Sequence, residues 1–431
     1  MWKTSTPWPC CRNGHAKHAD DPREEVLDWE TLARGKSSQS LWNLAQKSLL
    51  RHGELHHNLR MTWGKAFLAM TSQPCQALAQ CIDLNHRYAI DGRSPISYSG
   101  ILWSFGQFDR PSEPEQPIYG KVRSRTTDEQ GKRIDQPQVS EWINRPVAAG
   151  LPRVAVVGAG LAGLMAARTL QDHGLDVQVF EKSRGVGGRM ATRRSDSGGG
   201  FDHGAQYFTV RDDRFARHVR SWIQQGLVEP WLQPIVELQP GGKVVEEKCG
   251  TPRYVGVPGM NAIGKHLAAD LDVQLQTTVV SLNQVGERWK LQIENAGGSS
   301  SSDQATSVES GEFDCVIMNC PPAQAASLLA GHSDLEATAK QVEMLPCWSM
   351  MVRGEGLSDL GFVGAFINEG PLSWIARTRS QVASEPTNRP VRGCCMPRRI
   401  GRRSICNGRL IGSRKNCLVH WSRRRGDVFS E

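Results

Sequence analysis

The sequence predicts an α/β Rossmann-type domain that follows an all-α segment. An apolar run at residues 154–157 is typical of a buried parallel strand, and a GxGxxG motif follows it directly at 158–163. A helical apolar stretch at 164–171 and a second strand at 176–180 complete a strand–turn–helix–strand unit. Upstream, residues 24–89 repeat their apolar positions at helical spacing, which predicts several helices.

The glycine motif predicts a binding site for a dinucleotide. Gly158 permits the tight turn after the strand, and Gly160 lets the backbone approach a pyrophosphate. Gly163 allows the helix to pack closely on the strand, and the helix N-terminus presents N–H groups to phosphate oxygens. Glu181 lies 23 residues after Gly158, where an acidic side chain can accept ribose hydroxyls. A plain glycine-rich turn in a non-binding unit is the less favoured alternative, because spacing and context agree.

Two further motifs follow the second strand. Gly-Val-Gly-Gly-Arg-Met stands at 185–190, and Phe-Asp-His-Gly-Ala-Gln-Tyr-Phe stands at 201–208. With these motifs, residues from about 152 to 378 resemble the flavin amine-oxidase-like fold and, within it, the bacterial renalase-like oxidoreductases. Other blocks that match this group are residues 253–260, 313–322 and 345–348.

This resemblance implies FAD as the cofactor. The arginine of the GGR motif, here Arg189, would lie against the flavin diphosphate, and the Gln-Tyr pair, here Gln206 and Tyr207, would border the isoalloxazine. The backbone of Val279 or Val280 would contact the adenine. The expected cofactor-binding residues are Gly158, Gly160, Ala162, Gly163, Glu181, Lys182, Gly188, Arg189, Gln206, Tyr207 and Val279.

The resemblance also implies a small-molecule substrate. It would be a reduced nicotinamide dinucleotide, which in renalases is a misreduced NAD(P)H isomer, or an amine. The flavin would take a hydride from it, and oxygen would be the electron acceptor. The rest of the region fits a Rossmann-type FAD-binding domain with an inserted mixed-sheet substrate domain. Helices are expected at 214–227, 261–271 and 323–330, strands at 244–257, 273–282, 289–294, 313–318 and within 361–377, and a Ser/Gly-rich hairpin loop at 296–311.

The helical segment from about 22 to 135 resembles the C-terminal end of the FAD-binding domain of DNA photolyases, nearest to class II. The pieces that carry the resemblance are residues 55–65, 84–88, 91–95, 97–103 and 117–123. In that family the arginine of the RM pair and the aspartate of the DGR turn lie by the flavin. Here these are Arg60 and Asp91, a second and weaker candidate cofactor site, and the segment would bring DNA as a possible partner.

Two departures weaken the photolyase interpretation. His57 stands where the family commonly has Asn, and Pro95-Ile96-Ser97 replaces the Pro-Asn-Gly of the class II turn. The antenna domain and the first part of the flavin domain are also expected to be absent, although a flipped lesion base needs a complete pocket. We therefore favour an inert helical remnant over an active repair module here.

The expected boundaries are an irregular N-terminus at 1–22, the helical segment at 23–135, a linker at 136–152 and the oxidoreductase domain at 153–383. A basic tail at 384–431 follows, expected to be disordered or frameshifted. A basic nucleic-acid arm and a zinc site at Cys394, Cys395, Cys406, Cys417 and His420 are the alternatives, but that spacing fits no known zinc cluster. An out-of-frame tail is favoured, because another frame lets 392–397 spell Trp-Val-Leu-His-Ala, as renalase-like proteins have there. The oxidoreductase domain would then be incomplete at its C-terminal end, and an inactive truncated product is a third possible outcome.

Composition narrows the class of protein. The tail holds 12 basic and 3 acidic residues, so the rest of the chain carries one net negative charge although the whole carries +8. A general surface for polyanions is therefore not expected. There is no signal core and no run of 18 apolar residues, which predicts a cytoplasmic protein without a membrane partner. The 12 cysteines are then expected to be reduced.

Other catalytic chemistry finds little support. The sequence contains no HExxH, no other metal-binding motif and no GxSxG elbow, so no metal is expected. His203 beside Asp202 suggests acid–base chemistry, but a structural role next to the flavin is favoured. In a flavin oxidase the cofactor carries the electrons and the protein mainly orients the substrate. The catalytic residues are therefore left unassigned.

Overall fold

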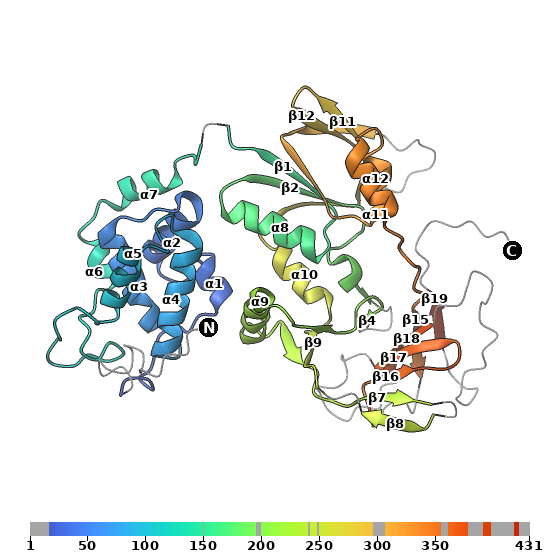
Figure 1. Cartoon of the computed structure of the whole chain (residues 1–431), viewed down its shortest axis with the longest axis horizontal. Coiled ribbons are helices and arrows are strands. Elements are labelled where there is room, and N and C mark those ends of the chain that lie inside the picture. The colour runs from blue at the N-terminus through green and yellow to red at the C-terminus, as the bar shows by residue number, and fades with distance from the viewer. Residues whose placement is uncertain are drawn as a thin grey trace. The chain divides into compact units, whose positions relative to one another are not determined.

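The computed structural model in Figure 1 describes most of the chain. The described residues are 17–148, 150–194, 200–239, 242–247, 250–295, 307–354, 361–377, 391–397 and 418–421. They form two compact units. The helical unit comprises Met1–Leu151, Thr169–Asp176 and Asp212–Gln225, and the sheet unit comprises Pro152–Arg168, Val177–Arg211 and Gly226–Glu431.

The helical unit is all-α, as the sequence predicts. Its helices are α1 (Trp29–Ala33), α2 (Ser40–His52), α3 (His57–Met70), α4 (Pro74–Tyr88), α5 (Pro95–Ser104), α6 (Thr127–Gly131), α7 (Gln136–Asn144) and α9 (Asp213–Gln224). Local signals set the ends: the Asp28 carboxylate caps α1, and Gly53 ends α2 at a φ of 68°. The core gathers around Trp42, whose indole donates a hydrogen bond to the Trp63 carbonyl at 3.1 Å.

The expected linker at 136–152 is wrong for its first half. Residues 136–144 form helix α7, and the Asp135 side chain caps its N-terminus. Ile143 is fully buried, and its carbonyl lies 2.9 Å from Nε2 of His52 in α2. The polar composition suggested a linker, but one buried side chain and one cap are sufficient to dock this short helix.

The first sheet of the sheet unit is the expected parallel Rossmann sheet. Its strands β1 (Arg153–Val157), β2 (Asp176–Glu181), β10 (Asp272–Leu275) and β14 (Cys315–Met318) stand in the order β10-β2-β1-β14. The pairs β1–β14 and β10–β2 are parallel. Helix α8 (Leu161–Asp172) follows β1 directly, and β1 is buried from Val154 to Val157. This burial explains why the sequence of the strand is continuously apolar.

A three-stranded antiparallel sheet lies against this core, formed by β11 (Thr277–Val285), β12 (Arg288–Asn295) and β13 (Ser307–Phe313). Phe313, Leu291 and Phe180 share one buried cluster. The hairpin loop expected at 296–311 is too long, because strand β13 begins at Ser307, and 296–306 lie outside the described residues. Pairing with β12 keeps the polar Ser and Glu residues of β13 in a strand despite their composition.

The expected mixed sheet is present. It has seven strands in the order β19 (Leu418–Trp421), β15 (Met350–Gly354), β18 (Val391–Pro397), β17 (Leu372–Arg377), β16 (Gly364–Ile367), β7 (Ile235–Leu238) and β8 (Val244–Glu247). The β16–β7 pair is parallel, and the other described pairs are antiparallel. The remaining elements of the unit are β3 (Thr192–Arg194), β4 (Gly200–Asp202), β5 (Phe208–Thr209), β6 (Val228–Pro230), β9 (Arg253–Gly256), α10 (Asn261–Ala268), α11 (Pro322–Leu328), α12 (Ser333–Gln341) and the 3₁₀ turn Gly188–Met190.

The tail differs from the expected disordered segment in two places. Strand β18 pairs with both β15 and β17, and strand β19 pairs with β15. The expectation of disorder is wrong for these two stretches, because backbone hydrogen bonds to neighbouring strands hold them in a sheet. The out-of-frame tail stays a prediction. The proposed zinc ligands Cys406 and Cys417 lie outside the described residues. No helix among the described residues is long and apolar enough to span a membrane.

Candidate functional site

The first glycine motif forms a turn with no room for side chains. Gly158 follows β1 with a φ of 107°, and a Cβ added to it would lie 3.0 Å from the Asn319 carbonyl oxygen. At Gly163, in the first turn of α8, an added Cβ would lie 2.3 Å from the Gly158 carbonyl oxygen. Helix α8 therefore starts directly against the end of β1. Its first N–H groups lack intrahelical acceptors, which is the arrangement that binds diphosphates.

The second glycine motif lies against the first. The N–H of Gly187 donates to the Ala159 carbonyl at 2.8 Å, and Gly187 and Gly160 form an isolated parallel bridge. Gly188 has a φ of 52°, and a Cβ added to it would lie 3.1 Å from Cα of Gly160. The two motifs, which lie far apart in sequence, thus form one backbone cradle. Arg189 follows Gly188 with an exposed side chain.

Glu181 stands at the end of β2 beside this cradle and is only 7% exposed. One carboxylate oxygen accepts the N–H of Ala159 at 2.7 Å, and the other accepts the N–H of Ser183 at 2.8 Å. A carboxylate oxygen has two acceptor sites, so each keeps capacity for a ribose hydroxyl. The predicted ribose acceptor is therefore also a brace of the glycine turn, a role that the spacing alone did not indicate.

Asn319 completes the cradle and was not predicted. It follows β14, the strand next to β1, and its N–H donates to the Val157 carbonyl at 2.8 Å. Its side-chain Nδ2 donates to the Gly158 carbonyl at 3.1 Å. Parallel strands end at one sheet edge, so a polar residue directly after a buried strand was the signal that could have found it.

The stretch expected to border the isoalloxazine is joined to the second glycine motif. The N–H of Ala205 donates to the Arg189 carbonyl at 2.9 Å. Gln206 Nε2 donates to the carbonyls of Asp202 and Gly204, each at 2.8 Å. Backbone acceptors thus hold the Gln206 amide in one orientation. Gln206 directly follows Ala205, the residue that is hydrogen-bonded to Arg189.

Tyr207 lies in an aromatic group. Its ring centroid is 5.7 Å from that of Trp231 and 5.6 Å from that of Trp374. The Arg253 guanidinium lies 5.5 Å from the Tyr207 ring. A cavity of about 10 Å³ adjoins this group and is lined by Asp202, Gln206, Trp231, Val255, Gly256, Ala376 and Arg377. Its volume is that of a single water molecule.

Asp202 is the half-buried acid that lines this cavity. Burial raises the pKa of its carboxyl, while the Thr192 hydroxyl and the Met260 N–H oppose that shift. Its Oδ1 accepts from the Thr192 hydroxyl at 2.5 Å and from the Met260 N–H at 3.0 Å. These bonds tie strands β3 and β4 to the start of α10, so Asp202 has a structural role, and the structure assigns no proton-transfer role to its neighbour His203.

The remaining predicted residues lie around the cradle with less direct contacts. Ala162 is exposed in the first turn of α8, and the exposed Lys182 donates to the side-chain oxygen of Gln324 at 3.0 Å. Val279 is buried, and the register between β11 and β12 shifts between Val279 and Ser281. Val280 is therefore a bulge residue that leaves the ladder, and bulges often adjoin binding sites. A separate cavity of about 360 Å³, lined by Arg153, Phe180 and Asn295 among others, contains none of the predicted cofactor positions.

The second predicted pair, in the helical unit, is also brought together. The two Nη atoms of Arg60 donate to the two oxygens of Asp91 at 2.8 and 2.9 Å. These hydrogen bonds hold the pKa of the Asp91 carboxyl below its usual range. Ser97 Oγ accepts from Arg60 at 3.1 Å and from Asn85 Nδ2 at 3.0 Å. This pair and the glycine cradle belong to different units.

Known proteins match two separate parts of the chain. Residues 156–223 match the family described as an NAD(P)-binding Rossmann-like domain. Both glycine motifs of the cradle lie within these residues. A flavin-dependent L-tryptophan oxidase, RebO, of Lentzea aerocolonigenes is 43% identical over 53 residues, which cover 12% of this chain and 11% of that protein. The solved structure of a putrescine oxidase triple mutant aligns with 57% of this chain and 75% of its own, at 14% identity and a TM-score of 0.42.

The N-terminal part of the chain is similar to photolyases. The deoxyribodipyrimidine photo-lyase of Oryza sativa subsp. japonica is 39% identical over 119 residues, which cover 28% of this chain. The chain spans only 24% of the length of that protein. Among the described residues, no group of three or more His, Cys, Asp or Glu side chains could hold a metal ion.

Proposed function

We propose that this chain is an FAD-dependent oxidoreductase with an amine-oxidase-like fold. The observation that carries the proposal is the joining of the two glycine motifs, with Gly187 bonded to Ala159 and Gly188 against Gly160. A Cβ at Gly158, Gly163 or Gly188 would lie 3.0, 2.3 or 3.1 Å from backbone atoms of the cradle itself, so the tight turn that lets a diphosphate approach the backbone needs glycine at these positions. The residues present therefore fit a flavin dinucleotide.

Each part of the site has a distinct task. The start of α8 and the Gly188–Arg189 turn bind the diphosphate, and Glu181 accepts the ribose hydroxyls. The backbone at Val279 and Val280 binds the adenine, while Gln206 and Tyr207 border the isoalloxazine. Bound FAD supplies the acceptor for a hydride and passes the electrons on to oxygen. The protein orients the substrate and excludes water, which requires no dedicated proton-transferring residue.

The substrate that we favour is a reduced nicotinamide dinucleotide, with an amine as the alternative. Tyr207 and Trp231 are half-buried beside Gln206 and pack with the buried Trp374, so theirs are the flat rings that a planar substrate would meet. The nearby guanidinium of Arg253 favours a substrate that carries negative charge over a cationic amine. The resemblance to renalase-like oxidoreductases points the same way.

The visible absorption spectrum of the purified chain tests the cofactor directly, with flavin quantified after denaturation. We expect close to one FAD for each chain. A chain that folds but takes up no flavin, even when FAD is added, would contradict the proposal. Oxygen consumption with dihydronicotinamide isomers and with amines then separates the two substrate classes.

A second candidate function rests on the Arg60–Asp91 pair. Its two parallel hydrogen bonds hold a guanidinium in a fixed orientation at the residues where photolyases place flavin neighbours. Light-driven repair of thymine dimers by the purified chain would support a photolyase activity. The absence of repair in a flavin-loaded chain would leave the oxidoreductase as the proposed function.

A further inference from the structure

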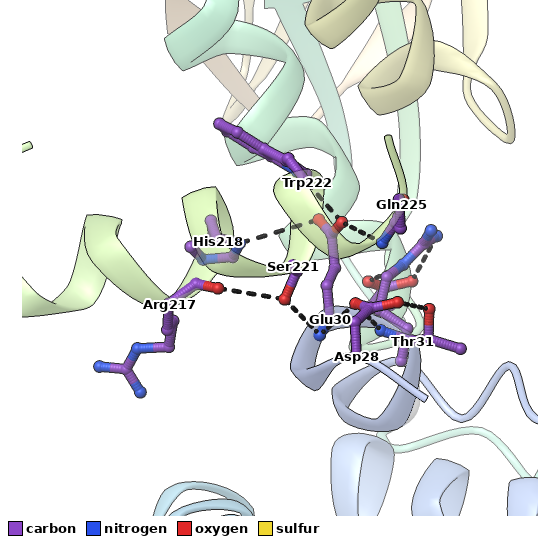
Figure 2. A network of polar contacts seen from close by, with 10 residues as sticks. Asp28, Glu30, Thr31, Arg217, His218, Ser221, Trp222 and Gln225 are labelled. Carbon is purple, nitrogen blue, oxygen red and sulfur yellow. Dashed lines mark hydrogen bonds and ion pairs between the residues drawn. The ribbon is translucent and has the colours of Figure 1, made fainter. Parts of the chain in front are cut away.

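The helical unit includes a helix that comes from far downstream in the sequence. Helix α9 belongs to the helical unit, although its residues fall within the stretch matched to the Rossmann-like family. Figure 2 shows α9 beside α1, with polar side chains of the two helices directed toward each other. Two groups of contacts hold α9 there.

The first group centres on Trp29 of α1. The guanidiniums of Arg217 in α9 and Arg87 in α4 lie 5.2 and 5.6 Å from its ring. The indole N–H of Trp29 donates to Asp83 at 2.8 Å, and Nη1 of Arg217 lies 3.1 and 3.0 Å from the two oxygens of the same carboxylate. Asp83 therefore fixes both the ring and the cation that lies on it.

The second group centres on Glu30, which is only 3% exposed. Its Oε2 accepts from the indole N–H of Trp222 at 3.2 Å and from Nε2 of Gln225 at 3.4 Å, as Figure 2 shows. Its backbone N–H donates to Ser221 Oγ at 3.0 Å, and His218 Nδ1 lies 3.7 Å from Oε1. A buried carboxylate is tolerated only with such partners, and here they come from the facing helix.

A third contact reaches the end of another downstream helix. Nε and Nη2 of Arg34 donate to the two oxygens of Asp172 at 2.8 and 3.1 Å. Both side chains are mostly buried, with exposed fractions of 11% and 18%. Asp172 is the last residue of α8, the helix that begins at the glycine cradle.

We propose that the photolyase-like helices are a docking platform for α9 and the end of α8. The face formed by Trp29, Glu30, Asp83 and Arg87 recognises a basic amphipathic helix with a buried tryptophan. The segment at 24–148 would then be a structural part of the oxidoreductase, and not an independent module on a linker. This inference concerns packing alone and does not depend on which cofactor or substrate binds.

The decisive experiment cuts the connection between the two parts of the full-length chain. A protease site is inserted after the exposed Ala148, the folded protein is cleaved, and the fragments are separated by size under native conditions. We expect the two fragments to elute together, because α9 keeps them joined. Immediate separation of the wild-type fragments would overturn the proposal.

Charge reversal tests whether α9 makes the contact. Arg217→Glu and Asp83→Arg should each weaken the association of the cleaved fragments by about tenfold or more, and the two changes together should restore most of it. The control is Arg214→Gln on the same helix, where the Arg214 side chain is 82% exposed and pairs with Asp212. It should change the association by less than about twofold.

Amide hydrogen exchange of α9 covers the case in which a variant fails to fold. In the uncut wild-type chain the α9 amides should exchange slowly, and Arg217→Glu should speed their exchange while the amides of α2 and α3 stay protected. Co-elution that none of these substitutions changes, together with unchanged α9 exchange, would overturn the assignment of α9 as the docked element.

Discussion

The two candidate sites are built from different chemistry. In the sheet unit, the cradle at Gly158, Gly163 and Gly188 is made of backbone and needs side chains to be absent. In the helical unit, Arg60 and Asp91 form a site through side-chain hydrogen bonds. The backbone cradle has no spare volume, whereas the Arg60–Asp91 pair lies at a surface where the Asp91 side chain is 52% exposed. A single added atom should therefore harm the first site far more than the loss of a whole side chain harms the second.

The largest effect is expected at Gly163. A valine there places a Cβ 2.3 Å from the Gly158 carbonyl oxygen, where neither backbone segment can give way. We expect Gly163→Val to lose bound flavin and to lower the free energy of unfolding by about 3 kcal/mol or more. Flavin content after denaturation and urea unfolding measure the two effects.

The matched control for Gly163 is Gly100→Ala in α5, where an added Cβ meets nothing within 4 Å. That change should keep flavin content and raise the free energy of unfolding by about 0.5–1 kcal/mol, because alanine is the better helix former. Normal flavin content in Gly163→Val would show that the cradle is not the cofactor site.

A smaller effect is expected at Glu181, whose side chain accepts backbone N–H groups of the cradle. Glu181→Gln keeps the volume but replaces one acceptor of a backbone N–H, from Ala159 or Ser183, by an amide NH₂. We expect a loss of about 1–3 kcal/mol in the free energy of unfolding, together with weaker flavin binding. The exposed Glu287→Gln is the control and should stay within about 0.5 kcal/mol of the wild type.

A third change tests whether the helical unit holds a flavin of its own. Arg60→Ala removes a partly exposed ion pair, so the free energy of unfolding should fall by less than about 1 kcal/mol. Flavin content should stay at the wild-type value, because the proposed FAD site lies in the sheet unit. A loss of flavin as large as that in Gly163→Val would contradict the placement of the FAD site in the sheet unit. It would favour the photolyase interpretation instead.

The same contrast explains what the sequence could predict. The glycine spacing and the apolar strand at 154–157 identified the Rossmann sheet, since a backbone site needs glycine at fixed positions. The helices at α3 and α4 were predicted from their apolar periodicity. The placements of Gly188, Arg189 and Gln206 around the cradle came from the family resemblance and not from spacing.

Features that depend on distant partners could not be predicted. Asn319 reaches the glycine turn only because its strand, β14, pairs with β1. Helix α7 depends on the packing that buries Ile143. Helix α9 reads as an ordinary amphipathic helix of the oxidoreductase region, and only the facing Trp29 and Glu30 assign it to the helical unit. Periodicity shows that a helix has a buried face but not what covers that face.

The smallest effect is a difference in pH dependence between the two units. Hydrogen bonds from Arg60 lower the pKa of Asp91, whereas burial raises the pKa of Asp202. Asp91 therefore stabilises the fold above its unfolded-state pKa of about 4, and this contribution is lost as the pH falls through the lowered native pKa. Asp202 behaves in the opposite way, and its contribution is lost as the pH rises through the raised native pKa.

Two asparagine variants separate these contributions. The cost of Asp91→Asn, measured as the shift in the thermal unfolding midpoint from pH 3 to pH 7, should grow as the pH rises. Asp202→Asn keeps an Oδ1 acceptor for Thr192 and Met260, so its cost should shrink over the same range or turn into a gain. Parallel slopes for the two variants would mean that Asp202 is charged in the fold despite its burial. A negative charge would then lie beside Gln206, which would favour a cationic amine over a reduced nicotinamide dinucleotide as the substrate.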